Sequence, residues 1–281
     1  MHEWALLIFT VCIQAAIGGM LMLAIFHKKI SQLGSEEAFK VMRLPLLVIA
    51  GLSIVGLGAS FAHLGTPTNA LNTMRGIGWS WMSREILVTG MFIGMACLTA
   101  GLTFVQKKVN PWLLLISSVI GLVDIYCMGM IYSSSLISGW SSINTFTSFY
   151  GTALVLGPVL AASFLVPLLK DKQNDLAQSI LKNAFYISLF GIAVQLVGVA
   201  VFGSAMPEVN MIAGNNALAS LEGYQTTVAF RWVIEAVGVG TLGYLSLAKN
   251  KKVSLSFAYV ALAVLVLAEG MSRYVFYVLG A

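Results

Sequence analysis

Charged residues are scarce in this chain. Only 10% of its 281 residues are Asp, Glu, Lys or Arg, whereas 58% are hydrophobic. A globular protein usually carries about 25% charged residues, because its water-facing surface requires them. The composition therefore excludes an ordinary soluble protein, and the mean hydropathy of +0.89 indicates burial in lipid.

The chain also has few cysteines, and no two of them are spaced as CxxC. All three lie inside apolar runs: Cys12, Cys97 and Cys127. Iron–sulfur and structural zinc sites need clusters of cysteine or histidine ligands at short spacing. The sequence therefore predicts that the chain holds no metal cluster of its own.

Long apolar runs, in contrast, fill most of the sequence. A helix needs about 20 apolar residues to cross about 30 Å of hydrocarbon. Eight such runs occur, at residues 4–26, 44–63, 85–105, 111–132, 149–169, 184–206, 228–248 and 254–277. We therefore predict an all-α integral membrane protein, with residues 1–281 forming a single transmembrane domain built as a bundle of eight helices.

Lysine and arginine are unevenly distributed between the loops. Twelve of the 16 lie in alternate loops. The other four lie in or beside the opposite loops: Arg75, Arg84, Arg231 and Arg273. Because basic loops stay in the cytoplasm, both termini are predicted on the outer (periplasmic) side, together with the loops at 64–84, 133–148 and 207–227. The basic inner loops account for the net charge of +5 without a nucleic-acid partner.

Several ionisable residues nevertheless lie within the spans, where burial is costly and usually serves a function. All fall in the predicted outer half: Asp124, Glu235 and Glu269 deeper, and His63, Glu85, Arg231 and Arg273 nearer the edge. Arg231 and Glu235 are spaced i, i+4, so their charges can neutralise each other on one helix face. The same spacing relates Glu269 to Arg273. Gln195 is the deepest polar side chain.

Two classes of membrane protein are disfavoured. A haem b needs two facing histidines at one depth. The chain has His2 and His63 at the outer rim and His27 on the inner side, so no haem is expected. A transporter usually places polar groups near the midplane with access from both sides, and the inner half of these spans offers no such path.

Short motifs stand out against the apolar background. They are His2-Glu3-Trp4, Ile8-Phe9-Thr10, His63-Leu64-Gly65-x-Pro67, Ala70-x-Asn72, Gly78-x-Ser80, Ser83-x-Glu85, Arg231, Glu269, Arg273 and Val275-Phe276-Tyr277. With these motifs the sequence resembles the membrane-anchor subunit (DmsC-like) of the bacterial dimethyl sulfoxide (DMSO) reductase family. The stretch from His63 to Glu85 is the most specific part of the match.

The resemblance implies a haem-free subunit of the bacterial inner membrane that works in anaerobic respiration. Such an anchor binds menaquinol near the outer face and passes its electrons to an iron–sulfur subunit with four [4Fe–4S] clusters. A molybdenum-pterin catalytic subunit then reduces an S-oxide or N-oxide, so the chain alone is not expected to reduce the acceptor. By the same resemblance, His63 and Glu85 are expected to bind and oxidise the quinol.

The chemistry of quinol oxidation agrees with these assignments. The reaction releases two electrons and two protons, so its site needs an apolar slot, hydrogen-bonding groups and a proton acceptor open to water. His63 and Glu85 are predicted to accept the protons. Further predicted binding residues, which would steady the carboxylates, contact the quinone oxygens or wall the slot, are Arg231, Arg273, Glu269, Trp79 and Trp81.

The main alternative is a purely structural anchor. In that case the soluble partner forms the quinol site, and the polar residues of this chain only dock the partner. Trp79 and Trp81 would then be ordinary tryptophans of the membrane interface. Asp124 is an additional acid in the fourth span, and the sequence leaves its role open.

Overall fold

The computed structural model describes residues 3–62, 67–137, 139–169, 173–213, 223–247 and 256–278, and these ranges contain no β-strand. The long helices are α1 (Glu3–Ser31), α2 (Ser35–Ala62), α3 (Trp81–Gln106), α4 (Pro111–Ser133), α5 (Ile143–Leu169), α6 (Asn174–Ala213), α8 (Gln225–Leu247) and α9 (Ser256–Val278). A 3-10 helix, η1 (Pro67–Gly76), precedes α3. Eight of the described helices are long and apolar enough to cross a membrane, which confirms the predicted all-helical class and the number of spans.

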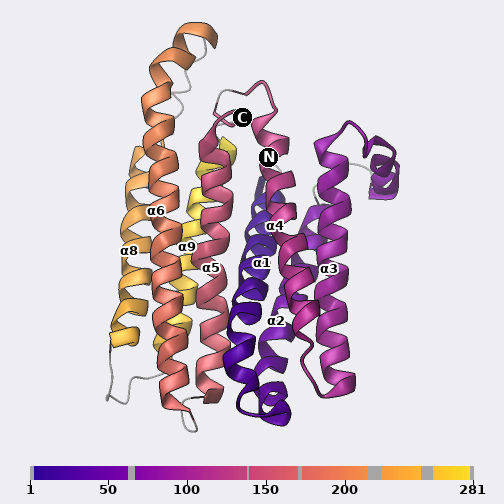
Figure 1. Ribbon diagram of the computed structural model, residues 1–281. Helices are drawn as coiled ribbons and strands as arrows, with labels where there is room; N and C mark the ends of the chain where they lie inside the picture. The colour runs from indigo at the N-terminus through magenta and orange to yellow at the C-terminus, as the bar shows by residue number, and fades with distance from the viewer. Residues whose placement is uncertain are drawn as a thin grey trace.

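Helices α1 and α5 form the centre of the bundle (Figure 1). In each of them 78% of the most apolar 18-residue stretch is buried inside the protein, against 28% for α6. Helix α1 packs against α2, α4, α5 and α9, and α5 packs against α6. Helix α3 lies beside α4 at one edge, whereas α8 lies beside α6 and α9 at the other (Figure 1). Helix α6 therefore leaves more of its surface open to lipid than α1 or α5 does.

The helix boundaries depart from the predicted spans mainly at their starts. Helix α2 begins at Ser35 instead of 44, and α6 begins at Asn174 instead of 184. The early turns are polar: in α2, Glu36 and Lys40 form an exposed ion pair of 2.7 Å. Hydropathy marks only the part of a helix that lies in hydrocarbon. Backbone hydrogen bonding continues the helix beyond it.

Close helix packing depends on glycine at one crossing. A side chain added at Gly18 of α1 would meet the backbone of Ala153 and Gly157 on α5, and one added at Gly157 would meet the backbone of Gly18. Gly90 and Gly94 of α3 have the GxxxG spacing that suits close helix packing. Among the described residues, however, a Cβ at either position would meet no atom within 4 Å beyond its own helix backbone.

The variant Gly157→Ala is therefore expected to destabilise the folded chain by about 1–3 kcal/mol. The added methyl group would clash with the backbone of Gly18, which cannot move aside as a side chain can. Thermal unfolding of the purified protein in detergent measures the effect. Gly94→Ala is the matched control and should unfold at the temperature of the unsubstituted protein. Equal unfolding temperatures for all three proteins would contradict the α1–α5 crossing.

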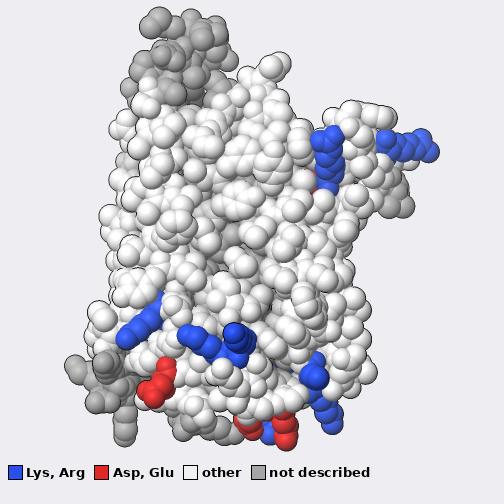
Figure 2. Space-filling model, in the orientation of Figure 1, with Lys and Arg blue, Asp and Glu red and all other residues white. Residues whose placement is uncertain are grey.

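Both chain termini lie at the same end of the bundle (Figure 1), where Trp4 of α1 stacks on Tyr274 of α9 with ring centroids 5.5 Å apart. On the face drawn in Figure 2, charged side chains of the described residues gather mainly at the opposite end, and the broad middle carries none. An uncharged middle between charged ends is the surface expected of a protein that spans a bilayer.

The orientation of the bundle in the membrane remains a prediction from the charge distribution. An alkaline-phosphatase fusion is active only outside the cytoplasm. We expect activity from a fusion after Ser135, beyond α4, and none from a fusion after Lys108, between α3 and α4. The reverse pattern would place the termini in the cytoplasm and overturn the predicted topology.

Candidate functional site

The start of α3 is held in place by its own polar side chains. Ser80 caps the helix by accepting a hydrogen bond from the backbone N–H of Ser83. The Ser83 hydroxyl donates to the carbonyl of Thr73 at 2.5 Å, which ties η1 to the helix. The Arg84 guanidinium donates to the carbonyls of Ile77 and Gly78 at 3.0 and 2.7 Å.

Arg84 also lies over the ring of Trp81, 4.4 Å from its centroid. With Arg84 engaged by the preceding loop, the next residue, Glu85, points into the bundle and is only 7% exposed. Burial of this carboxyl group within the first turns of a membrane-spanning helix is the feature expected of a functional acid.

A second carboxyl group lies close to Glu85. Thr89, one turn further along α3, donates its hydroxyl hydrogen to Asp124 Oδ1 of α4 at 2.7 Å. Asp124 is completely buried, and its Oδ2 has no hydrogen-bond partner among the described residues. Glu85 and Thr89 are spaced i, i+4 on α3 and so share the helix face from which Thr89 contacts Asp124. We call Glu85 and Asp124 the acidic pair, which is suited to taking up and releasing protons as a unit.

Three hydroxyl groups form a chain between α4, α9 and α1. The Tyr132 hydroxyl of α4 donates to that of Tyr277 at 3.2 Å, and Tyr277 in turn lies 3.3 Å from the hydroxyl of Thr10 on α1. Tyr132 follows Asp124 by about two turns on α4, and Tyr277 follows Arg273 by about one turn on α9. The chain of hydroxyls therefore joins the helix that carries Asp124 to the helix that carries part of a second group of polar residues.

This second group, here the central network, ties five helices together. Its members are Gln14 of α1, Thr152 of α5, Gln195 of α6, Arg231 and Glu235 of α8, and Glu269 and Arg273 of α9. Arg231 forms an ion pair of 3.1 Å with Glu235 and also donates to the side-chain oxygen of Gln195. The predicted pairing of Arg231 with Glu235 is thereby confirmed.

The other half of the central network is built around Thr152. Its hydroxyl donates to Glu269 at 2.7 Å, and Arg273 donates to the same hydroxyl at 3.2 Å. Glu269 also accepts from the Gln195 amide at 2.7 Å, and Arg273 donates to Gln14 at 2.7 Å. Glu269 and Arg273 are therefore connected through Thr152, a link that their i, i+4 spacing does not reveal.

The polar residues lie at two depths. Asp124 and most members of the central network lie about ten residues, or about 15 Å, from the helix ends near the chain termini. Glu85 is closer, one turn into α3, which begins at Trp81. Along the direction of the helices, Glu85 therefore lies nearer than Asp124 to that end of the bundle.

The predicted site residues are thus divided between separate places. Glu85 lies on α3 at one edge of the bundle, whereas Arg231 lies on α8 at the other (Figure 1). Trp79 is 81% exposed. Trp81 packs edge-on against Tyr126, with their ring centroids 5.9 Å apart. His63 lies outside the described residues, so the structure does not show its distance from Glu85.

Sequence reasoning missed several members of these clusters. Gln14, Thr89 and Thr152 were not singled out, because hydroxyl and amide groups in membrane spans commonly bond to their own helix backbone. The carbonyl oxygen of Ser148, on the same helix, lies 2.9 Å from the Thr152 hydroxyl oxygen and competes with Glu269 for its hydrogen. Gln195 had one visible signal, since it is the deepest polar side chain in its span.

Comparisons with known proteins all match this sequence to subunits of dimethyl sulfoxide (DMSO) reductases. The family model described as DMSO reductase anchor subunit (DmsC) matches residues 1–279. The protein is 31% identical over 169 residues to YnfH of Escherichia coli (strain K12), which is named as an anaerobic dimethyl sulfoxide reductase subunit, and the match covers 58% of each protein. It is 29% identical over 203 residues to an anaerobic dimethyl sulfoxide reductase subunit of Haemophilus influenzae, covering 71% of this protein and 68% of that one. A second E. coli K12 relative, likewise named for anaerobic dimethyl sulfoxide reductase, is 32% identical over 166 residues, covering 57% of this protein and 56% of that one. The matches to the two E. coli relatives therefore span little more than half their lengths.

Proposed function

The chain belongs to the DMSO reductase anchor subunit (DmsC) family of multi-pass bacterial inner-membrane proteins, and from this premise we propose that it anchors a DMSO reductase-type complex and oxidises menaquinol for it. The relatives named anaerobic dimethyl sulfoxide reductase support the assignment to anaerobic respiration. The terminal acceptor in this proposal is an S-oxide or N-oxide.

The proposed complex has two further subunits. An iron–sulfur subunit with four [4Fe–4S] clusters takes the electrons, and a molybdenum-pterin subunit reduces the acceptor. This chain supplies the site at which menaquinol gives up two electrons and two protons. The electrons leave to the iron–sulfur subunit, and the protons go to side chains of this chain and then to water.

The observation that carries the proposal is the acidic pair. Glu85 is buried one turn into α3, and Thr89 connects that helix to the buried Asp124. A general base must lie within reach of the proton it accepts and must be able to pass that proton on. In our proposal Glu85 accepts a quinol proton and releases it toward the near end of the bundle, Asp124 lies behind it as a second acid, and His63 accepts from the other hydroxyl.

A purely structural anchor is the second candidate. It is favoured by the exposed side chains of Arg75, in the last turn of η1, and Trp79, in the segment between η1 and α3, at one end of the bundle. A cation and a tryptophan of this kind are typical of residues that dock a partner protein. In that arrangement the iron–sulfur subunit would form the quinol site.

A short-tailed, water-soluble quinol separates the two candidates. The soluble catalytic and iron–sulfur subunits would be assayed with this quinol and with an artificial dye, with and without this chain in detergent. We expect dye-driven reduction in both preparations and quinol-driven reduction only when the chain is present. Equal quinol-driven reduction without the chain would leave it a structural role alone.

A further inference from the structure

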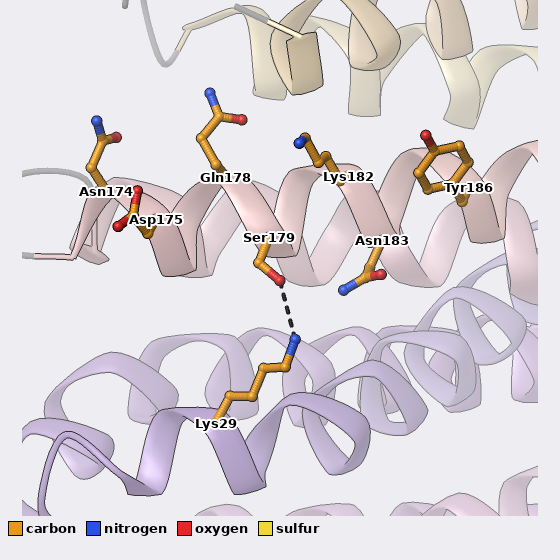
Figure 3. Close-up of a pocket in the computed structure, with 8 residues that line it drawn as sticks. All are labelled: Lys29, Asn174, Asp175, Gln178, Ser179, Lys182, Asn183 and Tyr186. Carbon is orange, nitrogen blue, oxygen red and sulfur yellow. Dashed lines mark hydrogen bonds between the residues drawn. The ribbon is translucent and has the colours of Figure 1, made fainter. Parts of the chain in front are cut away.

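A polar cavity lies at the end of the bundle away from the termini. Its volume is about 660 Å³, and it runs along the first turns of α6 (Figure 3). All of its lining residues carry hydrogen-bonding groups: Lys29, Asn174, Asp175, Gln178, Ser179, Lys182, Asn183 and Tyr186. Neither the acidic pair nor the central network contributes to this cavity, and the proposed quinol chemistry does not use it.

The lining provides groups that suit a phosphate. Lys29 reaches from α1 to α6 and donates to the Ser179 hydroxyl at 3.2 Å (Figure 3). Lys182 projects from a different side of α6 and brings a second ammonium group to the cavity. Asp175 contributes the one carboxylate among the described lining residues. Two ammonium groups beside amide and hydroxyl donors favour an anion over a cation.

The cavity continues into a surface that faces lipid. Tyr186 lines the cavity one turn beyond Lys182 and is 62% exposed. Leu189 and Phe190 follow on α6 with 46% and 61% of their surface exposed. A headgroup bound in this cavity would thus have its acyl chains lying along these apolar side chains.

We infer that this cavity binds the phosphate headgroup of an anionic phospholipid. The polar lining holds the headgroup at the membrane interface, and the exposed face of α6 receives the acyl chains. Basic pockets between spanning helices are suited to anionic headgroups, which are enriched in the cytoplasmic leaflet. The predicted orientation places this end of the bundle in that leaflet. The inference stands independently of the quinol proposal.

Native mass spectrometry of the full-length protein in detergent, with added phosphatidylglycerol or phosphatidylethanolamine, tests this site. The unsubstituted protein should retain phosphatidylglycerol, which is anionic, in preference to phosphatidylethanolamine, which has no net charge. The double variant K29Q/K182Q should bind it about thirtyfold more weakly, since each lysine near an anionic surface is worth about fivefold. The matched control K107Q/K108Q removes two lysines from the same end, beyond α3, and should bind as the unsubstituted protein does.

Equal loss in both double variants would show general charge attraction and overturn the site. Unchanged binding by K29Q/K182Q would overturn it as well. Displacement of the lipid by inorganic phosphate alone would reassign the cavity to a small anion and contradict the lipid inference. The arginine variant K29R/K182R keeps both charges and should retain the lipid, which distinguishes lost binding from lost folding.

Discussion

Replacing Glu85 with Gln is expected to lower quinol-driven reduction by about a hundredfold or more, because general acid–base catalysis contributes about 10²–10⁴-fold. Glutamine keeps the size of the side chain and its capacity to hydrogen-bond, but it cannot accept a proton. The fold around it should persist, since the start of α3 is held by Ser80, Ser83 and Arg84 rather than by Glu85. Dye-driven reduction, which bypasses the anchor, should be unchanged.

Both activities and the amount of bound catalytic subunit would be measured on the same membranes. Glu36→Gln is the matched control, because Glu36 is an exposed acid that pairs with Lys40 on α2. It should leave both activities unchanged. If Glu85→Gln instead lowered both activities together with the bound catalytic subunit, Glu85 would serve docking and the proposed proton acceptor would be wrong. His63→Phe is expected to behave as Glu85→Gln does.

The second large effect is expected in the central network. Arg231→Met leaves the carboxylate of Glu235 buried without its ion-pair partner and removes a donor to Gln195. Removing one member of a buried ion pair costs about 3–5 kcal/mol of stability. The variant should therefore accumulate poorly in the membrane and unfold at a markedly lower temperature than the unsubstituted protein.

A double variant separates lost pairing from lost packing. R231M/E235L removes both charges, so it should recover a substantial part of the stability that Arg231→Met loses. Lys40→Met breaks the exposed pair with Glu36 and should change the unfolding temperature little, because water screens that pair. A double variant no more stable than Arg231→Met would show that the ion pair is not what Arg231 contributes.

The fold was largely predictable because the bilayer imposes it. A helix that crosses hydrocarbon must be apolar for about 20 residues, and that requirement is visible in the sequence. The crossing of α1 and α5 at Gly18 and Gly157 was not predictable. A glycine pattern shows where a helix allows close contact, but it does not show which other helix packs there. Gly90 and Gly94 have the GxxxG spacing, and yet no other described helix approaches either of them.

The candidate site was predictable only in part. The pairing of Arg231 with Glu235 follows from helix geometry, because four residues make about one turn. The proximity of Glu85 to Asp124 depends on how α3 packs on α4, and the link between Glu269 and Arg273 depends on Thr152 of α5. Contacts between helices that are distant in sequence follow from tertiary packing and not from spacing along one helix.

The most direct measurement for the central claim is a titration of the isolated protein with a quinol analogue, in detergent and without soluble partners. The account predicts one saturable site. Glu85→Leu removes a hydrogen bond to the ligand and should weaken binding at least about tenfold, whereas Glu36→Gln should leave the affinity unchanged. Saturable binding that appears only after the iron–sulfur subunit is added, or that Glu85→Leu does not alter, would contradict a quinol site built by this protein.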